Sequence, residues 1–99
     1  MGRTKKPRIC SCPFEDMRHR IFKPAGIPTT ELQQILLDED ELEAMRLCDV
    51  DGLTQENAGV KMGVSRGTVQ RLLASGREKT VLSLLEGKAL VLNAGKRPA

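Results

Sequence analysis

The pattern of small, apolar and helix-capping positions is most regular between Thr54 and Arg71. Thr54 is a residue type that caps helix N-termini, and the glycine at position 63 can end that helix in the left-handed conformation. Ser65 is a second cap, after which apolar residues recur every three or four positions. The pattern therefore predicts two helices joined by a three-residue turn, which is the spacing of a helix-turn-helix motif at about 54–76.

The two helices of such a motif touch closely, so a small side chain is required on the first helix about one turn before the turn glycine. Ala58 and Gly59 stand there. At 100° per residue, one face of the second helix carries Val69, Leu72, Leu73 and Gly76. The rest of the surface of this helix carries Arg66, Gly67, Gln70, Arg71 and Ala74. We expect the first face to pack and the second to be free to read DNA.

The segment before this motif is predicted to contain an extended piece and two helices. Residues 21–28 include two prolines, and each biases its predecessor towards extended geometry. Thr30 is expected to cap a short helix that carries Leu32, Ile35 and Leu36, with Gln33 in the capping-box position.

A longer helix is predicted to begin at Asp38 and to run to about Asp49. Glu41 stands three residues after Asp38, as in a capping box, and acidic side chains suit the positive end of the helix dipole. Because no His, Ser or Lys is placed to complete a catalytic set, the carboxylates of 38–43 are explained as cap and dipole residues. The sequence therefore gives no support for an enzyme.

The second motif helix is predicted to continue to about Glu86 and to end at Gly87, followed by a short strand over 88–92. That strand and the neighbouring leucines have two possible partners, the Ile21–Phe22 segment of the same chain or a second protomer. A homodimer would use the apolar residues Val81, Leu82, Leu85, Leu90 and Leu92.

Composition favours helices. Hydrophobic residues make up 39% of the 99, with two Phe and no Trp or Tyr, so the core must be aliphatic. We predict an all-α, winged-helix-like helix-turn-helix domain over 21–92 with short extended N- and C-terminal segments, a flexible basic arm over 1–20 and a polar tail over 93–99. No apolar run reaches the roughly 18 residues of a membrane span, and the N-terminus lacks a signal peptide's apolar region, so we expect a cytoplasmic protein.

Charge is divided unevenly along the chain. Residues 1–23 hold seven Lys/Arg and two Asp/Glu, residues 31–56 hold one and nine, and residues 57–99 hold eight and two. Two basic ends that flank an acidic middle can present one basic surface to phosphates. An ordinary solvated surface is the alternative.

The basic arm carries Arg3, Lys5, Lys6 and Arg8. Such arms gain DNA affinity by displacing counterions, although a solubilising tail has the same composition.

Cys10, Cys12 and His19 do not have metal-site spacing. A Cys-x-Cys pair is tighter than the Cys-x2–4-Cys of structural zinc, and no second Cys/His pair follows. We expect no metal and no cofactor. Reduced thiols are favoured, with Cys48 buried on a helix, and redox sensing by Cys10 and Cys12 is an alternative.

Several motifs resemble, in order, a family of small bacterial and archaeal proteins, domain of unknown function 134, also called uncharacterised protein family 0251. The resemblance covers about Ile21 to Leu92 and rests on Lys23–Pro28, Leu42–Leu47, Gln55–Ala58, Met62–Thr68 and Glu86–Leu90. It implies a helix-turn-helix domain similar to the fourth region of bacterial sigma factors, presumed to bind DNA. By position, Arg66, Gly67, Gln70 and Arg71 would then meet base edges, and Thr68 would lie near a phosphate.

The sequence thus favours a sequence-specific DNA-binding protein that regulates transcription, with double-stranded DNA as its partner. The residues expected to contact DNA are Arg66, Gly67, Thr68, Gln70, Arg71, Ser65, Lys61, Arg77, Lys79, Arg3, Lys5, Lys6 and Arg8. The alternative is a protein–protein interaction module of the same shape that does not read DNA and docks its acidic helix on the transcription machinery.

Overall fold

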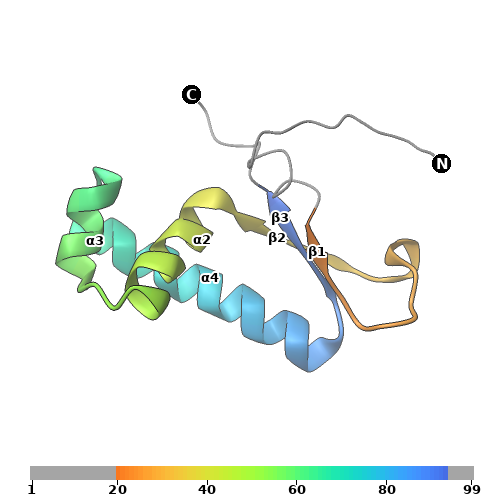
Figure 1. The fold of residues 1–99 in the computed structure, drawn as a ribbon. Coiled ribbons are helices and arrows are strands. Elements are labelled where there is room, and N and C mark those ends of the chain that lie inside the picture. Colours follow the sequence, from red (N-terminus) through yellow and green to blue (C-terminus); the bar gives the residue numbers. More distant parts are fainter. Residues whose placement is uncertain (1–19, 94–99) are drawn as a thin grey trace.

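The computed structural model describes residues 20–93, and these form a mixed α/β fold (Figure 1). In chain order the elements are β1 (Ile21–Phe22), the 3-10 helix η2 (Thr29–Glu31), β2 (Gln34–Asp38), α2 (Glu39–Met45), the π-helical η3 (Arg46–Val50), α3 (Gln55–Met62), α4 (Arg66–Glu86) and β3 (Ala89–Asn93). The expectation of an all-α domain was therefore wrong, because a three-stranded sheet accompanies the helices. None of the described helices is long and apolar enough to cross a membrane.

The sheet has the order β1-β3-β2, so the strand that comes last in the chain lies in the middle. β3 pairs antiparallel with β1, where Ile21 faces Val91, and parallel with β2, where Leu36 also faces Val91. The predicted strand at 88–92 is confirmed within one residue. Its pairing with the Ile21–Phe22 segment of the same chain, one of the two predicted alternatives, is confirmed.

The helix predicted to start at Thr30 is absent. Residues 29–31 form a single 3-10 turn, and residues 34–38, which hold Ile35 and Leu36, form β2 instead. Parallel pairing with β3 explains the difference: the Ala89 N–H donates to the Gln33 carbonyl at 2.9 Å, and the ladder continues to Asn93. This partner lies more than fifty residues away in the chain, beyond the reach of local capping signals.

The other helix boundaries follow the predictions. The Asp38 N–H donates to Glu41 Oε1 at 2.9 Å at the start of α2, as a capping box requires. α2 continues without a break into η3, which ends at Val50, one residue after the predicted end. Gly87 ends α4 with φ +67°.

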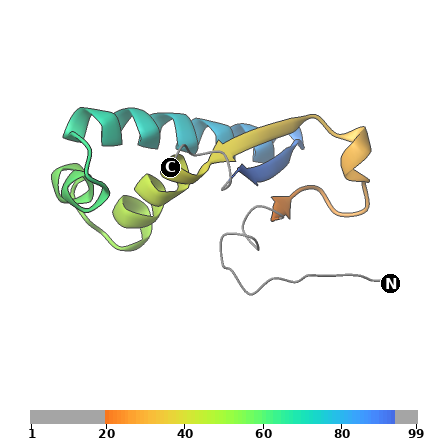
Figure 2. The ribbon, with the colours of Figure 1, turned by 90° about the horizontal axis from the view of Figure 1, so that it is seen from above.

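Two hydrophobic clusters lie along α4. Ala44, Leu47, Ala58, Val69 and Leu73 form one between the helices, and Leu37, Leu90 and Leu92 form the other on the sheet. Figures 1 and 2 show α3 and the sheet at opposite ends of α4, with α2 beside it.

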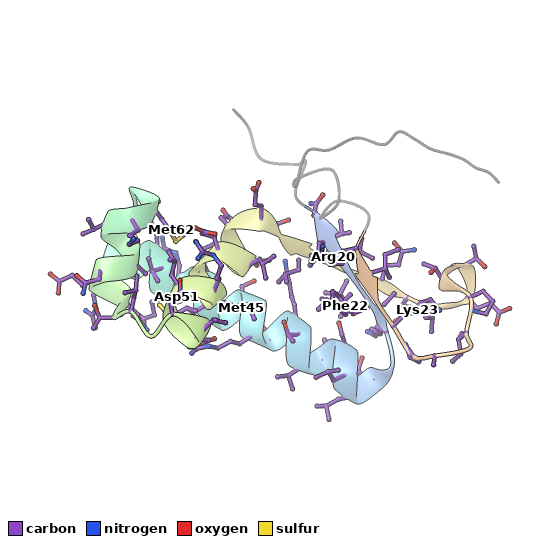
Figure 3. All side chains as sticks on the ribbon, viewed as in Figure 1. Arg20, Phe22, Lys23, Met45, Asp51 and Met62 are labelled. Carbon is purple, nitrogen blue, oxygen red and sulfur yellow. The ribbon has the colours of Figure 1, made fainter. Side chains whose placement is uncertain are left out.

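Met45 packs against both clusters, and Figure 3 shows it between the two ends. A Cβ on Gly76 of α4 would lie 2.6 Å from Met45 Sδ and 3.3 Å from Glu41 Cβ. A larger residue at this position would therefore require Met45 and Glu41 to shift, and this close contact of α2 with α4 joins the two clusters.

Candidate nucleic-acid interface

The α3–turn–α4 unit is held by the capping residues that its sequence predicts. Thr54 Oγ1 accepts from the Asn57 N–H at 3.0 Å, and Ser65 Oγ accepts from the Thr68 N–H at 3.1 Å. Between the helices Gly63 has φ +74°, in the left-handed region that favours glycine. The path of the chain through the turn is thus fixed by local hydrogen bonds.

Close packing fixes the angle between the two helices. Ala58 is fully buried, and a Cβ on Gly59 would lie 2.7 Å from the Val64 carbonyl oxygen. The Val64 N–H in turn donates to the Gly59 carbonyl at 2.9 Å. The requirement for small residues at 58 and 59 is confirmed, and at 59 it is strict because the opposing atom belongs to the backbone.

The predicted division of α4 into two faces also holds. Val69, Leu73 and Gly76 are buried and Leu72 is half-buried. The residues at the N-terminal end of α4 that point away from the core are all exposed: Arg66, Gly67, Gln70 and Arg71. We call these four the polar face of α4; Ala74, one turn further, is exposed as well.

Hydroxyl groups order part of the polar face. Arg71 Nη2 donates to Thr68 Oγ1 at 3.2 Å, and the same oxygen lies 3.0 Å from Ser65 Oγ. Arg71 is therefore oriented along the first turn of α4 before any ligand is bound. Arg66 is exposed and makes no ion pair within residues 20–93.

Two of the cations predicted to contact DNA form ion pairs with carboxylates of this chain. Arg77 donates to both carboxylate oxygens of Asp49, at 3.1 and 2.5 Å, and this guanidinium lowers the pKa of the Asp49 carboxyl. Lys79 Nζ lies 2.8 Å from Glu41 Oε1. Neither belongs to the polar face, and both connect α4 to the α2–η3 segment.

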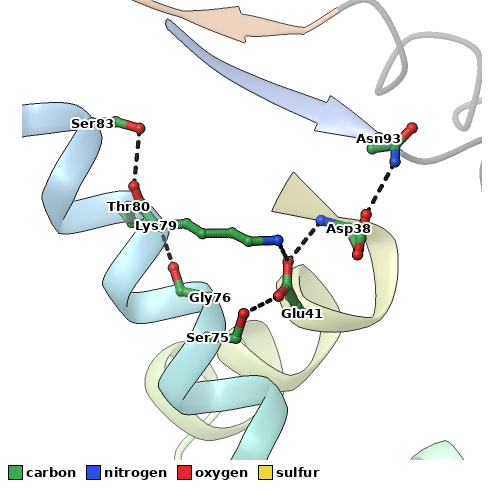
Figure 4. A network of polar contacts seen from close by, with 8 residues as sticks. All are labelled: Asp38, Glu41, Ser75, Gly76, Lys79, Thr80, Ser83 and Asn93. Atoms are coloured by element: carbon green, nitrogen blue, oxygen red, sulfur yellow. Dashed lines mark hydrogen bonds and ion pairs between the residues drawn. The ribbon is translucent and has the colours of Figure 1, made fainter. Parts of the chain in front are cut away.

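Glu41 is the centre of a polar network that the sequence did not reveal (Figure 4). Its side chain is only 6% exposed, and it accepts from Lys79, from the Ser75 hydroxyl and from the Asp38 N–H. Burial alone would raise the pKa of Glu41, but these hydrogen bonds and the Lys79 charge outweigh burial and lower it. Local sequence predicted only its capping role, because its other partners lie 34 and 38 positions away.

A groove of about 340 Å³ lies beside the polar face. Its polar lining includes Glu39, Asp40 and Glu43 of α2 together with Lys61 of α3 and Thr68 of α4. Lys61 is therefore placed among carboxylates, although it is on the same side of the molecule as Thr68. The apolar lining of the groove consists of Met62, Val64 and Leu72.

Several predicted site residues lie outside the described residues. These are Arg3, Lys5, Lys6 and Arg8 of the arm, together with Cys10, Cys12 and His19. Cys48 is a free, half-buried cysteine packed against the helical cluster. Within residues 20–93 no three His, Cys, Asp or Glu side chains are gathered as a metal ion would require.

The apolar residues proposed for a dimer differ in how far they are exposed. Leu90 and Leu92 are buried in the protein's own sheet, so they cannot serve as contact residues between copies in this fold. Val81 and Leu85 are exposed, and the neighbouring Leu84 is 79% exposed. Leu82 is half-buried.

Comparison with known proteins shows the family. Residues 1–98 match the family described as "Protein of unknown function DUF134". A UPF0251 protein of Shewanella pealeana is 45% identical over 92 residues, covering 93% of each chain, and one of Vibrio vulnificus is 47% identical over 92 residues, covering 93% of this chain and 89% of the relative.

A UPF0251 protein of Halothermothrix orenii is 51% identical over 76 residues, which cover 77% of this chain but 56% of that relative. The chain thus spans the near-full length of some relatives and little more than half of others. No solved structure gives a significant match. From the full-length family match and these identities, the chain belongs to the DUF134 family of UPF0251 proteins.

Proposed function

We propose that this protein binds double-stranded DNA in a sequence-specific manner and regulates transcription, with α3 and α4 as a helix-turn-helix similar to the fourth region of sigma factors. The observation that carries the proposal is the polar face of α4. Two arginines and a glutamine are exposed together on the first two turns of a helix whose start is fixed by Ser65 and by the contact at Gly59. In such motifs the first residues of the second helix enter the major groove.

Each side chain of this face has a suitable hydrogen-bonding role. An arginine can donate two bonds to guanine O6 and N7, and a glutamine can pair with adenine N6 and N7. Arg66 is available for either a base or a phosphate, whereas Arg71 must leave or share its bond to Thr68. Backbone N–H groups at the start of α4 favour a phosphate near Ser65 and Thr68.

The DNA-binding test compares arginines on and off the polar face. Fluorescence anisotropy on duplexes selected from a random pool should show that Arg66→Ala with Arg71→Ala weakens binding by at least about tenfold and lowers the salt dependence. Arg46→Ala is the control, because Arg46 is exposed on η3 and is paired with Glu43 and Asp51. Equal affinities of the two variants would remove the polar face from the proposal.

The groove beside the polar face favours a second candidate, a protein-interaction module. Its lining combines three carboxylates with apolar residues, which suits a basic partner helix with exposed apolar side chains. If no duplex binds at low salt, and Glu39→Lys with Glu43→Lys abolishes capture of a component of the transcription machinery, this candidate replaces DNA binding.

A further inference from the structure

An apolar patch lies at the end of α4 opposite to the polar face. Val81, Leu84 and Leu85 of α4 are 52, 79 and 78% exposed, and Phe22 of β1 is 57% exposed. Figure 3 shows Phe22 beside the C-terminal part of α4. Position 81 is one helical turn from positions 84 and 85, so these three side chains form a continuous surface. We call these four residues the apolar patch.

A groove of about 630 Å³ adjoins the patch. Phe22, Pro24, Leu84 and Leu90 supply its apolar lining, and Thr80 and Ser83 lie between them. Leu84 belongs to both surfaces, while the neighbouring Leu85 is turned out to solvent. A surface with protruding leucines next to an apolar hollow can fit a second copy of itself, because a two-fold axis places each protrusion in the partner's hollow.

Charge around the patch also suits a second copy. The nearest ion pair, Lys88 with Glu86 at 2.9 Å, is neutral, and Lys23 is directed to the Ile27 carbonyl at 2.6 Å. Glu78 adds one negative charge on the same exposed side of α4. Two copies would therefore face little like-charge repulsion at this surface, unlike at the basic polar face or at the acidic start of α2.

We infer that the apolar patch and its groove are the two-fold interface of a homodimer. A protein–protein interface of standard size buries about 800 Å² per partner, so the lining of the groove is needed in the contact as well as the four patch residues. The interface is thus placed on Phe22, Val81, Leu84 and Leu85, since Leu90 and Leu92 are already used inside the fold.

The length of α4 limits how far apart the two polar faces can lie. From the middle of the polar face to the middle of the patch is about 14 residues, or about 22 Å of helix at 1.5 Å per residue. A two-fold axis at the patch therefore holds the polar faces at most about 45 Å apart. This range includes successive major grooves about 34 Å apart and excludes grooves two turns apart. The spacing, but not the dimer itself, rests on the proposed function.

The dimer is tested in the absence of DNA. Sedimentation equilibrium of the full chain at tens of micromolar should give a dimer, and Leu84→Asp with Leu85→Asp should raise the dissociation constant at least about tenfold. Val50→Asp with Val60→Asp is a matched control, because Val50 and Val60 are 78 and 77% exposed elsewhere on the surface. Circular dichroism confirms that both double variants are folded.

A monomeric wild type, or a dimer that survives the leucine substitutions, overturns the inference. The second measurement uses duplexes with paired half-sites: tightest binding with centres about 10 base pairs apart supports the placed interface, and tightest binding at about 21 contradicts it. Absence of DNA binding would count against the proposed function, while the sedimentation result would still decide the dimer.

Discussion

The two ends of α4 differ both in what holds them and in what they expose. Its N-terminal end packs on α3, which directly precedes it in the chain, and exposes Arg66, Gln70 and Arg71. Its C-terminal end packs near strands drawn from both ends of the described chain and exposes Leu84 and Leu85. The first end depends on short-range hydrogen bonds and the second on long-range pairing. One helix thus carries two surfaces with separate structural supports.

The largest expected effect on stability comes from disrupting the contact between α2 and α4 at Gly76, which lies between the two ends. Gly76→Val should lower the free energy of unfolding by about 3 kcal/mol, because a side chain there collides with Met45 and Glu41. Ala74→Val is the control on the exposed side of the same helix and should cost about 0.5 kcal/mol. Urea denaturation gives both values. Similar losses for the two variants would mean that α2 and α4 separate easily.

A smaller loss is expected from the polar network in the middle of α4. Lys79→Met leaves Glu41 buried without its cation and should cost about 2 kcal/mol at neutral pH, less than for a fully buried pair because Lys79 is partly exposed.

The same substitution carries a pH prediction. The pKa of Glu41 is lower in the folded than in the unfolded state, so the pair stabilises the protein above the unfolded pKa and this contribution is lost as pH falls through the folded pKa. The difference between wild type and Lys79→Met should therefore be largest at neutral pH and shrink below about pH 4. A difference that does not vary from pH 7 to pH 3 would show that the carboxylate charge is not involved.

The caps at the N-terminal end of α4 should contribute less. Ser65→Ala removes the acceptor for the Thr68 N–H and should cost about 1 kcal/mol, whereas Ser65→Thr should retain most of the stability. Hydrogen exchange sharpens the contrast: amides in the first turn of α4 should exchange faster in Ser65→Ala, while those near Glu86 should not. Equal acceleration along the helix would mean that the ends are not separately supported.

The smallest expected change is a gain. A Cβ on Gly67 would lie 3.8 Å from Arg71 Nη1 and 3.9 Å from Ser65 Oγ, which is ordinary contact. Gly67→Ala should therefore stabilise the protein by about 0.5–1 kcal/mol. On the proposed function, a loss of DNA affinity in this more stable variant would indicate that the helix backbone approaches the duplex closely at Gly67. Anisotropy and thermal unfolding together separate the two effects.

What could be predicted from the sequence follows the same contrast. The caps at Thr54, Ser65 and Gly63, and the small residue at 59, depend on neighbours a few positions away, and they were predicted correctly. β2 was not, since the run Ile35–Leu37 becomes a strand only through β3. Nothing local indicated this pairing, and the capping pattern at Thr30 favoured a helix instead.

The candidate interfaces show the same limit. Arg66, Gln70 and Arg71 were placed on an exposed face by helical periodicity alone, and the structure has them there. The internal partners of Arg77 and Lys79 lie 28 and 38 positions away, and periodicity carries no information about them. Likewise, Leu90 and Leu92 were predicted as dimer contacts because the sequence did not show that both are buried in the sheet.

The central position of β3 has a consequence for how the chain folds during synthesis. The outer strands β1 and β2 leave the ribosome first, but their shared partner, residues 89–93, follows about fifty residues after β2. The helices from α2 to most of α4 can assemble in the meantime, because their contacts with one another lie within that stretch. The apolar Ile35–Leu37 run must wait unpaired until then, so the nascent chain passes through a stage in which this segment is open to chaperones and to association with other chains.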